Sequence, residues 1–429
     1  MPKYGSRMKN RTMIQCSRIA SLIAIVLFAA NSEAYSVLTH EELIDLAWKD
    51  SIRPLLLAKF PNATDQDLRV AHSFAYGGSA VQDMGYYPFG KVFFSNLTHY
   101  VRSGDFVSWM LQNASTINEY AFAMGALSHY LGDSIGHSEA INPATAIEFP
   151  KLEKKYGRKV TYGESPHGHI RTEFAFDVGE MKNVEFAPPA YLRHIGFRVP
   201  RKFLERAFKA TYGFELHEVL GEPTAALKSY RGSVRSFIPS FAEAEIVLNG
   251  HKFPPPPDDE AYRVFSERVS RTSYDRNWKH TYKGPGVKAH LLAVLVFIVP
   301  KIGPLSDLAI KIPEAQTLEM YLKSMNHTVD VFRDQLEKAV GQAGTPLALA
   351  NVDLDTGEHD QAGKYPLADQ AYAQLLAKLT AKPERPIPGE LKRHILGFYA
   401  AEDGLSGQRE DISNQLATLR DMKVRSQGE

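Results

Sequence analysis

The chain has 429 residues, and its 50 Lys and Arg residues nearly balance its 49 Asp and Glu residues, so the formal net charge is +1. This balance argues against a nucleic-acid-binding protein that works through bulk positive charge, because such domains usually carry a basic excess. The length exceeds that of a typical domain, so we expect one large domain with an appendage, or two domains.

The first 34 residues have the organisation of a secretory signal peptide: a basic stretch, the apolar run IASLIAIVLFAA and the small-residue sequence SEA, which ends at Ala34. The apolar run is shorter than the ~20 residues that a membrane-spanning helix needs. We therefore expect a secreted or periplasmic protein that begins at Tyr35 and has no transmembrane span. Cleavage removes five positive charges, one negative charge and the single cysteine, Cys16, which leaves a net charge of −3. Disulfides then cannot stabilise the mature chain.

Helix signals dominate the remainder, and period-two strand patterns are scarce, which predicts an all-α fold. THEE (39–42) and TINE (116–119) both fit the capping-box pattern of a helix start. The first predicts a helix that runs to about Arg53, where Pro54 discourages continuation. The second predicts a long apolar helix from Ile117 to about Ala140, ended by Asn-Pro at 142–143.

The connecting segments differ in composition. The Gly- and Tyr-rich stretch 75–90 predicts an ordered loop, and FPPPPDD (253–259) predicts a stiff, extended break. LLAVLVFIV (291–299) predicts a buried helix, with an interfacial patch that touches lipid as the alternative. We expect a catalytic domain over 35–340 and an accessory helical tail over 341–429. The tail contains NVDLDTGE, whose glycine is misplaced for a calcium-binding EF-hand.

Histidines crowd into the first third of the mature chain. In HYLGDSIGH, His129, Asp133 and His137 follow one another at four-residue intervals, so a helix would place them on one face. His169 and Glu173 in HIRTE repeat this spacing. Imidazole nitrogen and carboxylate oxygen are the donors that Zn²⁺ accepts in catalytic sites, and we expect a zinc site within residues 35–180.

HYLGD followed by a histidine, and then by His-x-x-x-Glu, resembles the zinc-dependent phospholipase C family, which is related in fold to the fungal single-strand-specific zinc nucleases. The resemblance covers roughly residues 35–180 and implies an all-α domain with three zinc ions. The metal ligands it implies are Tyr35, His40, Asp83, His99, His129, Asp133, His137, His169 and Glu173. Tyr35 stands where the family usually has Trp and would bind through its own backbone amine and carbonyl. His72 and His167 lie near this set but outside the pattern.

The resemblance implies a secreted trinuclear zinc phosphodiesterase, above all a phospholipase C that releases a phosphorylated headgroup from phospholipids at a membrane surface. Asp133 would bridge two zinc ions, and Asp83 would orient or deprotonate the attacking water; both are the implied catalytic residues. We expect no stable binding of nucleic acid. Two alternatives remain open: a single-strand-specific nuclease or 3′-nucleotidase on the same scaffold, and a non-catalytic, metal-stabilised binding protein.

Overall fold

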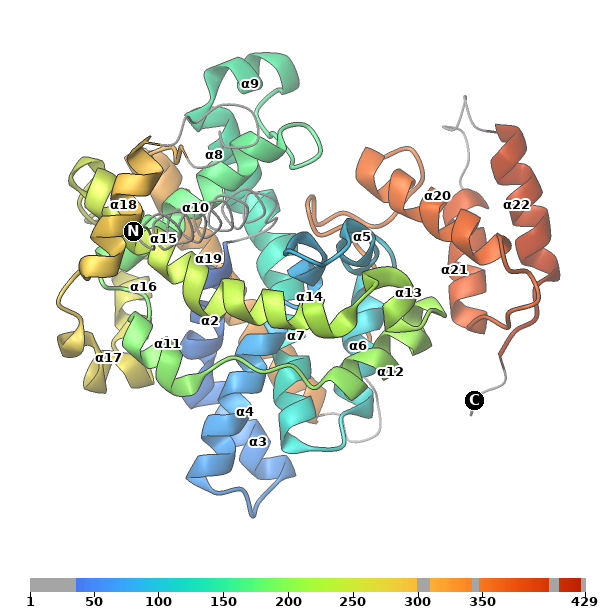
Figure 1. Ribbon diagram of the computed structural model, residues 1–429, viewed down its shortest axis with the longest axis horizontal. Coiled ribbons are helices and arrows are strands. Elements are labelled where there is room, and N and C mark those ends of the chain that lie inside the picture. The colour runs from blue at the N-terminus through green and yellow to red at the C-terminus, as the bar shows by residue number, and fades with distance from the viewer. Residues whose placement is uncertain (1–35, 299–308, 342–346, 401–408, 426–429) are drawn as a thin grey trace, which may run out of the picture.

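The structure, a computed structural model, describes residues 36–298, 309–341, 347–400 and 409–425. The signal peptide and Tyr35 therefore lie outside the described residues. Within the described ranges the chain forms helices joined by loops, and the only β-type pairings are the isolated bridges Val352–His359 and Ile387–Val424 (Figure 1). The expected all-α fold is confirmed.

The first eleven α-helices in chain order are α2 (Val37–Ala47), α3 (Arg53–Lys59), α4 (Asp65–Gly78), α5 (Val92–Tyr100), α6 (Ser103–Asn113), α7 (Ile117–Gly136), α8 (Asn142–Glu148), α9 (Pro150–Tyr156), α10 (Pro166–Lys182), α11 (Pro189–Ile195) and α12 (Arg201–Tyr212). They continue with α13 (Leu216–Leu220), α14 (Pro223–Gly232), α15 (Ile238–Asn249), α16 (Glu260–Val269), α17 (Ser273–Asn277), α18 (Val287–Ile298), α19 (Ala315–Gly341), α20 (Pro366–Thr380), α21 (Gly389–Ala400) and α22 (Arg409–Asp421).

Helix α7 forms the centre of the core and packs against α2, α4, α6 and α19. Its side chains are buried almost continuously from Tyr120 to Asp133. Two glycines let α4 and α7 come close: a Cβ at Gly78 would lie 2.1 Å from the Phe122 carbonyl oxygen, and a Cβ at Gly125 would lie 2.1 Å from that of Ala75. This contact brings the chain that leaves α4 beside the polar residues of α7.

The N-terminus of α2 differs from the predicted capping box. The helix begins at Val37, so Thr39 and Glu42 are buried inside it. Thr39 Oγ1 donates to Asp177 Oδ1 at 2.6 Å, and the Glu42 carboxylate accepts from Tyr274. The prediction at THEE is wrong because tertiary partners satisfy these polar groups. At Thr116 the predicted helix start is confirmed, since its side chain accepts from the backbone amide of Glu119, but the Glu119 carboxylate accepts from the amide of Ser115 and so does not complete the capping box.

Three π-helical turns precede prolines that do not end their helices. These turns are η1 (Trp48–Ile52), η3 (His137–Ile141) and η4 (Ser233–Phe237), and each leads into a helix with a proline in its first turn, at Pro54, Pro143 and Pro239. A first-turn proline costs no hydrogen bond that the new helix needs. The predicted ends near Arg53 and Ala140 are therefore wrong.

The predicted segments between helices are partly confirmed. Residues 75–78 complete α4 and η2 (Gln82–Tyr86) is a 3₁₀ turn, so the expected loop over 75–90 is wrong in its first part. Residues 253–259 are non-helical, as expected. In Figure 1, α20, α21 and α22 gather at one edge, and α20 packs on α5.

Candidate metal centre

Three groups of buried histidine and carboxylate side chains converge within the helical core. In each group the donor atoms lie within 4.8 Å of one another. The groups are His40, His129 and Asp133; Asp83, His99 and His129; and His137, His169 and Glu173. All eight described residues of the implied ligand set therefore come together, and we refer to the groups as the first, second and third donor groups.

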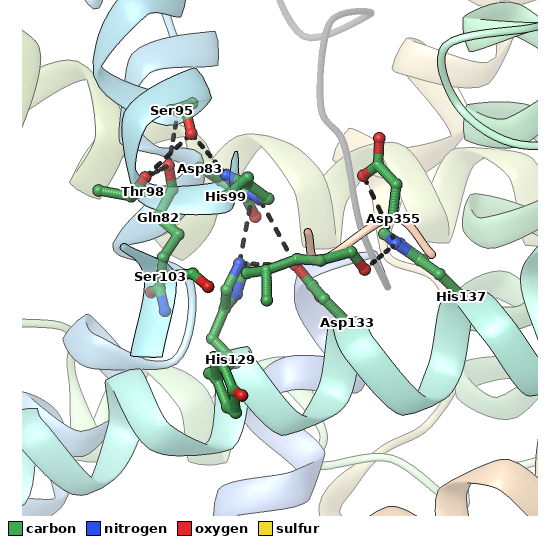
Figure 2. A network of polar contacts seen from close by, with 12 residues as sticks. Gln82, Asp83, Ser95, Thr98, His99, Ser103, His129, Asp133, His137 and Asp355 are labelled. Carbon is green, nitrogen blue, oxygen red and sulfur yellow. Dashed lines mark hydrogen bonds and ion pairs between the residues drawn. The ribbon is translucent and has the colours of Figure 1, made fainter. Parts of the chain in front are cut away.

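Asp133 connects the first two groups. Its Oδ1 lies 3.2 Å from His40 Nε2, and its Oδ2 lies 2.9 Å from His129 Nε2 and 3.4 Å from His99 Nε2. Asp83 Oδ1 approaches the same cluster at 3.4 Å from His99 Nε2. Figure 2 shows Asp133 on the helix between His129 and His137, with His99 and Asp83 together above it. The two oxygens of Asp133 thus face the first and the second donor group.

Separate elements deliver these side chains. α2 carries His40, η2 carries Asp83, and α5 carries His99. His129 and Asp133 share the face of α7, because residues four apart in a helix lie above one another. His137 is the first residue of the π-turn η3, so the helix does continue through it, although in π-helical form. α10 carries the third group's other two members.

The histidine rings are held in one tautomer by their second nitrogens. His99, His129 and His137 each donate from Nδ1 to a backbone carbonyl, of Ser95, Ser79 and Leu354, at 2.8, 3.0 and 3.0 Å. A carbonyl only accepts, so Nδ1 carries a proton, and in the neutral ring the lone pair lies on Nε2, which faces the donor group. This is the arrangement in which metal-ligating histidines are usually found.

His169 uses the opposite nitrogen. Its Nε2 donates to Asn142 Oδ1 at 2.9 Å, while the amide nitrogen of Asn142 donates to the Asp355 carbonyl at 2.7 Å and so sets the orientation of that amide. Nδ1 of His169 is left to face Glu173 Oε1, 2.6 Å away. The lone pair of His169 therefore points into the third donor group.

The glycine in HYLGD has a steric role. A Cβ on Gly132 would lie 3.1 Å from Cε1 and 3.2 Å from Nδ1 of His40, which is closer than ordinary packing allows. Glycine at this position lets α2 approach α7 closely enough for His40 to reach Asp133.

Burial and charge shift the pKa values in this cluster. Burial lowers the pKa of His40, and the neighbouring His129 lowers it further. Burial acts on His99 in the same direction, but the close Asp133 and Asp83 carboxylates outweigh it and raise the pKa of His99 well above its ordinary value. Burial opposes ionisation of Asp133, yet His129 and the close ring nitrogens of His40 and His99 hold its pKa well below the ordinary value. Asp133 is thus an anion in the core.

The donor atoms themselves show that cations fit these groups. Nε2 of His99, His129 and His137 and both carboxylate oxygens of Asp83 and Asp133 are buried and have no hydrogen-bond partner among the described residues. Buried polar atoms of this kind are rare, because each costs free energy unless it is paired. A bound cation would satisfy them together, and nitrogen and oxygen donors in sets of three suit zinc.

A segment of the tail supplies contacts that sequence reasoning missed. Leu354 accepts the Nδ1 proton of His137, and Asp355 Oδ1 lies 3.7 Å from the same nitrogen (Figure 2). Asp355 is fully buried and accepts hydrogen bonds from the hydroxyl groups of Tyr100 and Tyr365. The segment that contains Leu354 and Asp355 thus anchors the tail against His137.

We expect Asp355→Ala to weaken zinc binding at the third donor group by about 10- to 100-fold, the usual cost of losing a residue that orients a metal-ligating histidine. The variant removes the acceptor of two tyrosine hydroxyls and with it the anchor of the Leu354 carbonyl. Competition with a chromophoric chelator measures the effect. Glu358→Ala, on an exposed residue of the same segment, is the matched control, and equal affinities of the two variants would contradict the expectation.

Two nearby histidines are placed away from the donor groups. His72 Nε2 lies 3.0 Å from Asp45 Oδ1, and its ring stacks on Trp48. His167 is exposed on α10. Neither belongs to a donor group among the described residues.

Comparisons with known proteins agree with this geometry. The family model described as zinc dependent phospholipase C matches residues 39–221. No curated protein and no solved structure matched the chain. The matched residues include all eight members of the three donor groups, from His40 to Glu173. The match supports a zinc-dependent phospholipase C family for the part of the chain that carries the three donor groups.

Proposed function

We propose that the protein is a secreted phospholipase C that binds three zinc ions. Tyr35, His40 and one oxygen of Asp133 would hold one ion. Asp83, His99, His129 and the other oxygen of Asp133 would hold the second. The third donor group would hold the last. The observation that carries this proposal is the convergence of three buried donor groups inside the family-matched residues.

Zinc bound there would supply charge that makes water acidic near neutral pH and stabilises negative phosphoryl oxygens. The protein side chains position the ions and the attacking water. Asp133 directs one oxygen to each of the first two groups, which fixes their separation. Asp83 is fully buried beside His99, where its carboxylate accepts the proton of the attacking water.

The proposed reaction is the hydrolysis of the bond between phosphorus and the glycerol oxygen. The water oxygen attacks phosphorus in line with the bond to the glycerol oxygen, and that bond breaks. The leaving oxygen takes up a proton, so the products are diacylglycerol and a phosphorylated headgroup. Buried donor groups favour this reaction over one in bulk water, because electrostatic interactions are stronger in a low-dielectric site.

The aromatic residues near the site favour a lipid substrate over single-stranded nucleic acid. Single strands are held by exposed aromatic rings on which bases stack. Tyr86 and Tyr87, which follow Asp83, are buried in the core, and Phe89 is the exposed ring of this stretch. A continuous stacking platform beside Asp83 is therefore not formed by these residues.

The substrate class is tested by incubating mature, zinc-loaded protein with mixed phospholipid vesicles and, separately, with single-stranded DNA. The proposal expects phosphorylated headgroup and diacylglycerol from the first and no nucleotides from the second. Nucleotide release without headgroup release would overturn it in favour of a nuclease, and neither product would favour a metal-stabilised binding protein.

A form that keeps one extra residue before Tyr35 is expected to bind fewer zinc ions and to lose activity at least about tenfold. A free α-amine, with a pKa of about 8, can give up its proton and bind zinc, whereas an amide nitrogen in the extended form cannot. Elemental analysis measures the zinc content. One extra residue at the C-terminal end is the control, and equal stoichiometry in both forms would refute this role for Tyr35.

A further inference from the structure

Helix α18 carries most of the large exposed hydrophobic side chains of the described residues. Of nine large exposed hydrophobic side chains there, six belong to α18, at Val287, Leu291, Val294, Leu295, Phe297 and Ile298. The predicted burial of this segment is wrong: Leu291 is 64% exposed and Phe297 is 76% exposed. We call these six residues the α18 face, since most of them recur at three- and four-residue spacing on one side of the helix.

The opposite side of α18 is firmly attached to the protein. Ala289, Ala293 and Val296 are buried, and the helix packs against α15. Val296 forms a small apolar cluster with Phe241 of α15. The α18 face is therefore the outward side of a docked helix, at the edge of the molecule opposite α20, α21 and α22 (Figure 1).

Helix α18 is connected through α15 to the helix that carries two members of the third donor group. Phe241 of α15 stacks on Phe174 of α10, with ring centroids 5.2 Å apart, and Phe174 is the neighbour of Glu173 in the chain. The chain beyond α18 returns to the same helix, where Lys311 N donates to the Arg171 carbonyl. Only α15 separates α18 from the helix that carries His169 and Glu173.

The charges around α18 complement an anionic surface. Between Asp275 and Asp307 the sequence has no acidic residue, while it has five Lys and Arg residues. Of these, Lys283 and Lys288 are exposed at the N-terminal end of α18. Basic residues near an anionic lipid surface are attracted to it, and the attraction adds to burial of an apolar face.

The described part of α18 is too short to cross a bilayer. Its 12 residues extend only about 18 Å, well below the ~30 Å of a bilayer's hydrocarbon core. Within the described ranges, no helix combines the length and the apolar character that crossing a bilayer requires. A short helix with an exposed apolar face and flanking cations lies in the plane of a membrane interface instead.

We propose that α18 inserts its apolar face into the surface of an anionic phospholipid membrane and thereby holds the third donor group near the lipid headgroups. This inference deepens the proposed phospholipase function and rests on it for the identity of the substrate. Vesicle binding is nevertheless a property of α18 itself, so it is measured without reference to catalysis.

The test compares the wild type with a Leu291→Ser/Phe297→Ser variant, which changes two exposed residues and leaves the charge unchanged. Sedimentation with phosphatidylcholine vesicles containing 30% phosphatidylserine should show at least about tenfold weaker binding by the variant. Phe89→Ser, a change at a residue that is 72% exposed elsewhere, is the matched control and should bind as the wild type does. Lys283→Gln/Lys288→Gln should weaken binding to these vesicles more than to pure phosphatidylcholine.

Measurements of phospholipid hydrolysis distinguish a failure of this inference from a failure of the proposed function. Hydrolysis of a monomeric, short-chain phospholipid should be the same in wild type and the Leu291→Ser/Phe297→Ser variant, whereas hydrolysis of vesicles should fall with binding. Equal vesicle binding by both proteins would overturn the inference. A wild-type dimer that this variant converts to a monomer, without vesicle binding, would overturn it in favour of a subunit interface. Wild type that binds vesicles through α18 but hydrolyses neither substrate would refute the phospholipase and support the membrane contact.

Discussion

Asp133→Asn is expected to reduce phospholipid hydrolysis by at least about 10³-fold, because metal ions contribute several kcal/mol to transition-state stabilisation and each 1.36 kcal/mol is a factor of ten. Asp133 offers one oxygen to His40 and the other to His129 and His99. Asparagine keeps the shape but offers one neutral oxygen and an NH₂ group that repels a cation. The first and second donor groups should both bind zinc more weakly, which elemental analysis after dialysis will show.

Asp334→Asn is the matched control for this change, since Asp334 is an exposed residue of α19 that pairs with Lys338. It makes the same chemical substitution and should leave zinc content and activity unchanged. Far-ultraviolet circular dichroism of both variants checks that the helices are retained. An Asp133→Asn protein with full zinc content and full activity would remove the basis of the proposed mechanism.

Glu180→Gln is expected to stabilise the protein by about 3 kcal/mol at pH 7 and by less than about 1 kcal/mol at pH 5. Glu180 is 1% exposed on α10. Burial, with the nearby Glu185 and Asp177 carboxylates, raises the pKa of Glu180 from 4.5 to about 8. The folded state therefore holds a proton that the unfolded chain releases above pH 4.5. The stability that this proton provides is complete below pH 4.5 and is lost as the pH rises towards 8.

Urea unfolding at several pH values measures this difference between Glu180→Gln and the wild type. Comparison at each pH cancels the contribution of zinc, which both proteins share. Glu337→Gln changes an exposed residue of α19. Its free energy of unfolding should differ from that of the wild type by the same amount at every pH. A constant difference between pH 5 and pH 8 would mean that Glu180 does not retain its proton on folding.

Much of the donor set could be predicted from local spacing. His129 and Asp133, like His169 and Glu173, are four residues apart, and a helix turns that spacing into a shared face. The all-α fold followed from the same helical periodicity. His40, Asp83 and His99 have no such local signal, and only their resemblance to a family's order of residues suggested them.

The contacts that orient the donors could not be predicted in this way. Leu354 lies 217 residues from His137, and Asp355 lies 213 residues from Asn142. No periodic pattern links positions so distant, and the hydrogen bonds run to backbone carbonyls, which any residue type supplies. The predicted tail boundary at 341 separated these residues from a site that they help to hold.

The failed helix predictions share a physical cause, which is that tertiary contacts override local preferences. Thr39 fits a helix cap, yet Asp177 offers it a buried partner. The apolar run 291–299 fits a buried helix, yet only one side of α18 meets the protein. A residue's type fixes what it can bond to, and the packing of distant elements decides which partner it finds.

The π-turn η3 has a consequence for insertions and deletions. A π-turn holds one residue more than an α-turn, and one residue corresponds to about 100° of helical rotation. Loss of a single residue such as Ser138 would restore a regular helix and swing α8 round its axis. Asn142, at the start of α8, would then turn away from both His169 and Asp355. The length of η3, rather than its composition, therefore sets the rotation of α8 relative to α7 and so the direction in which Asn142 points.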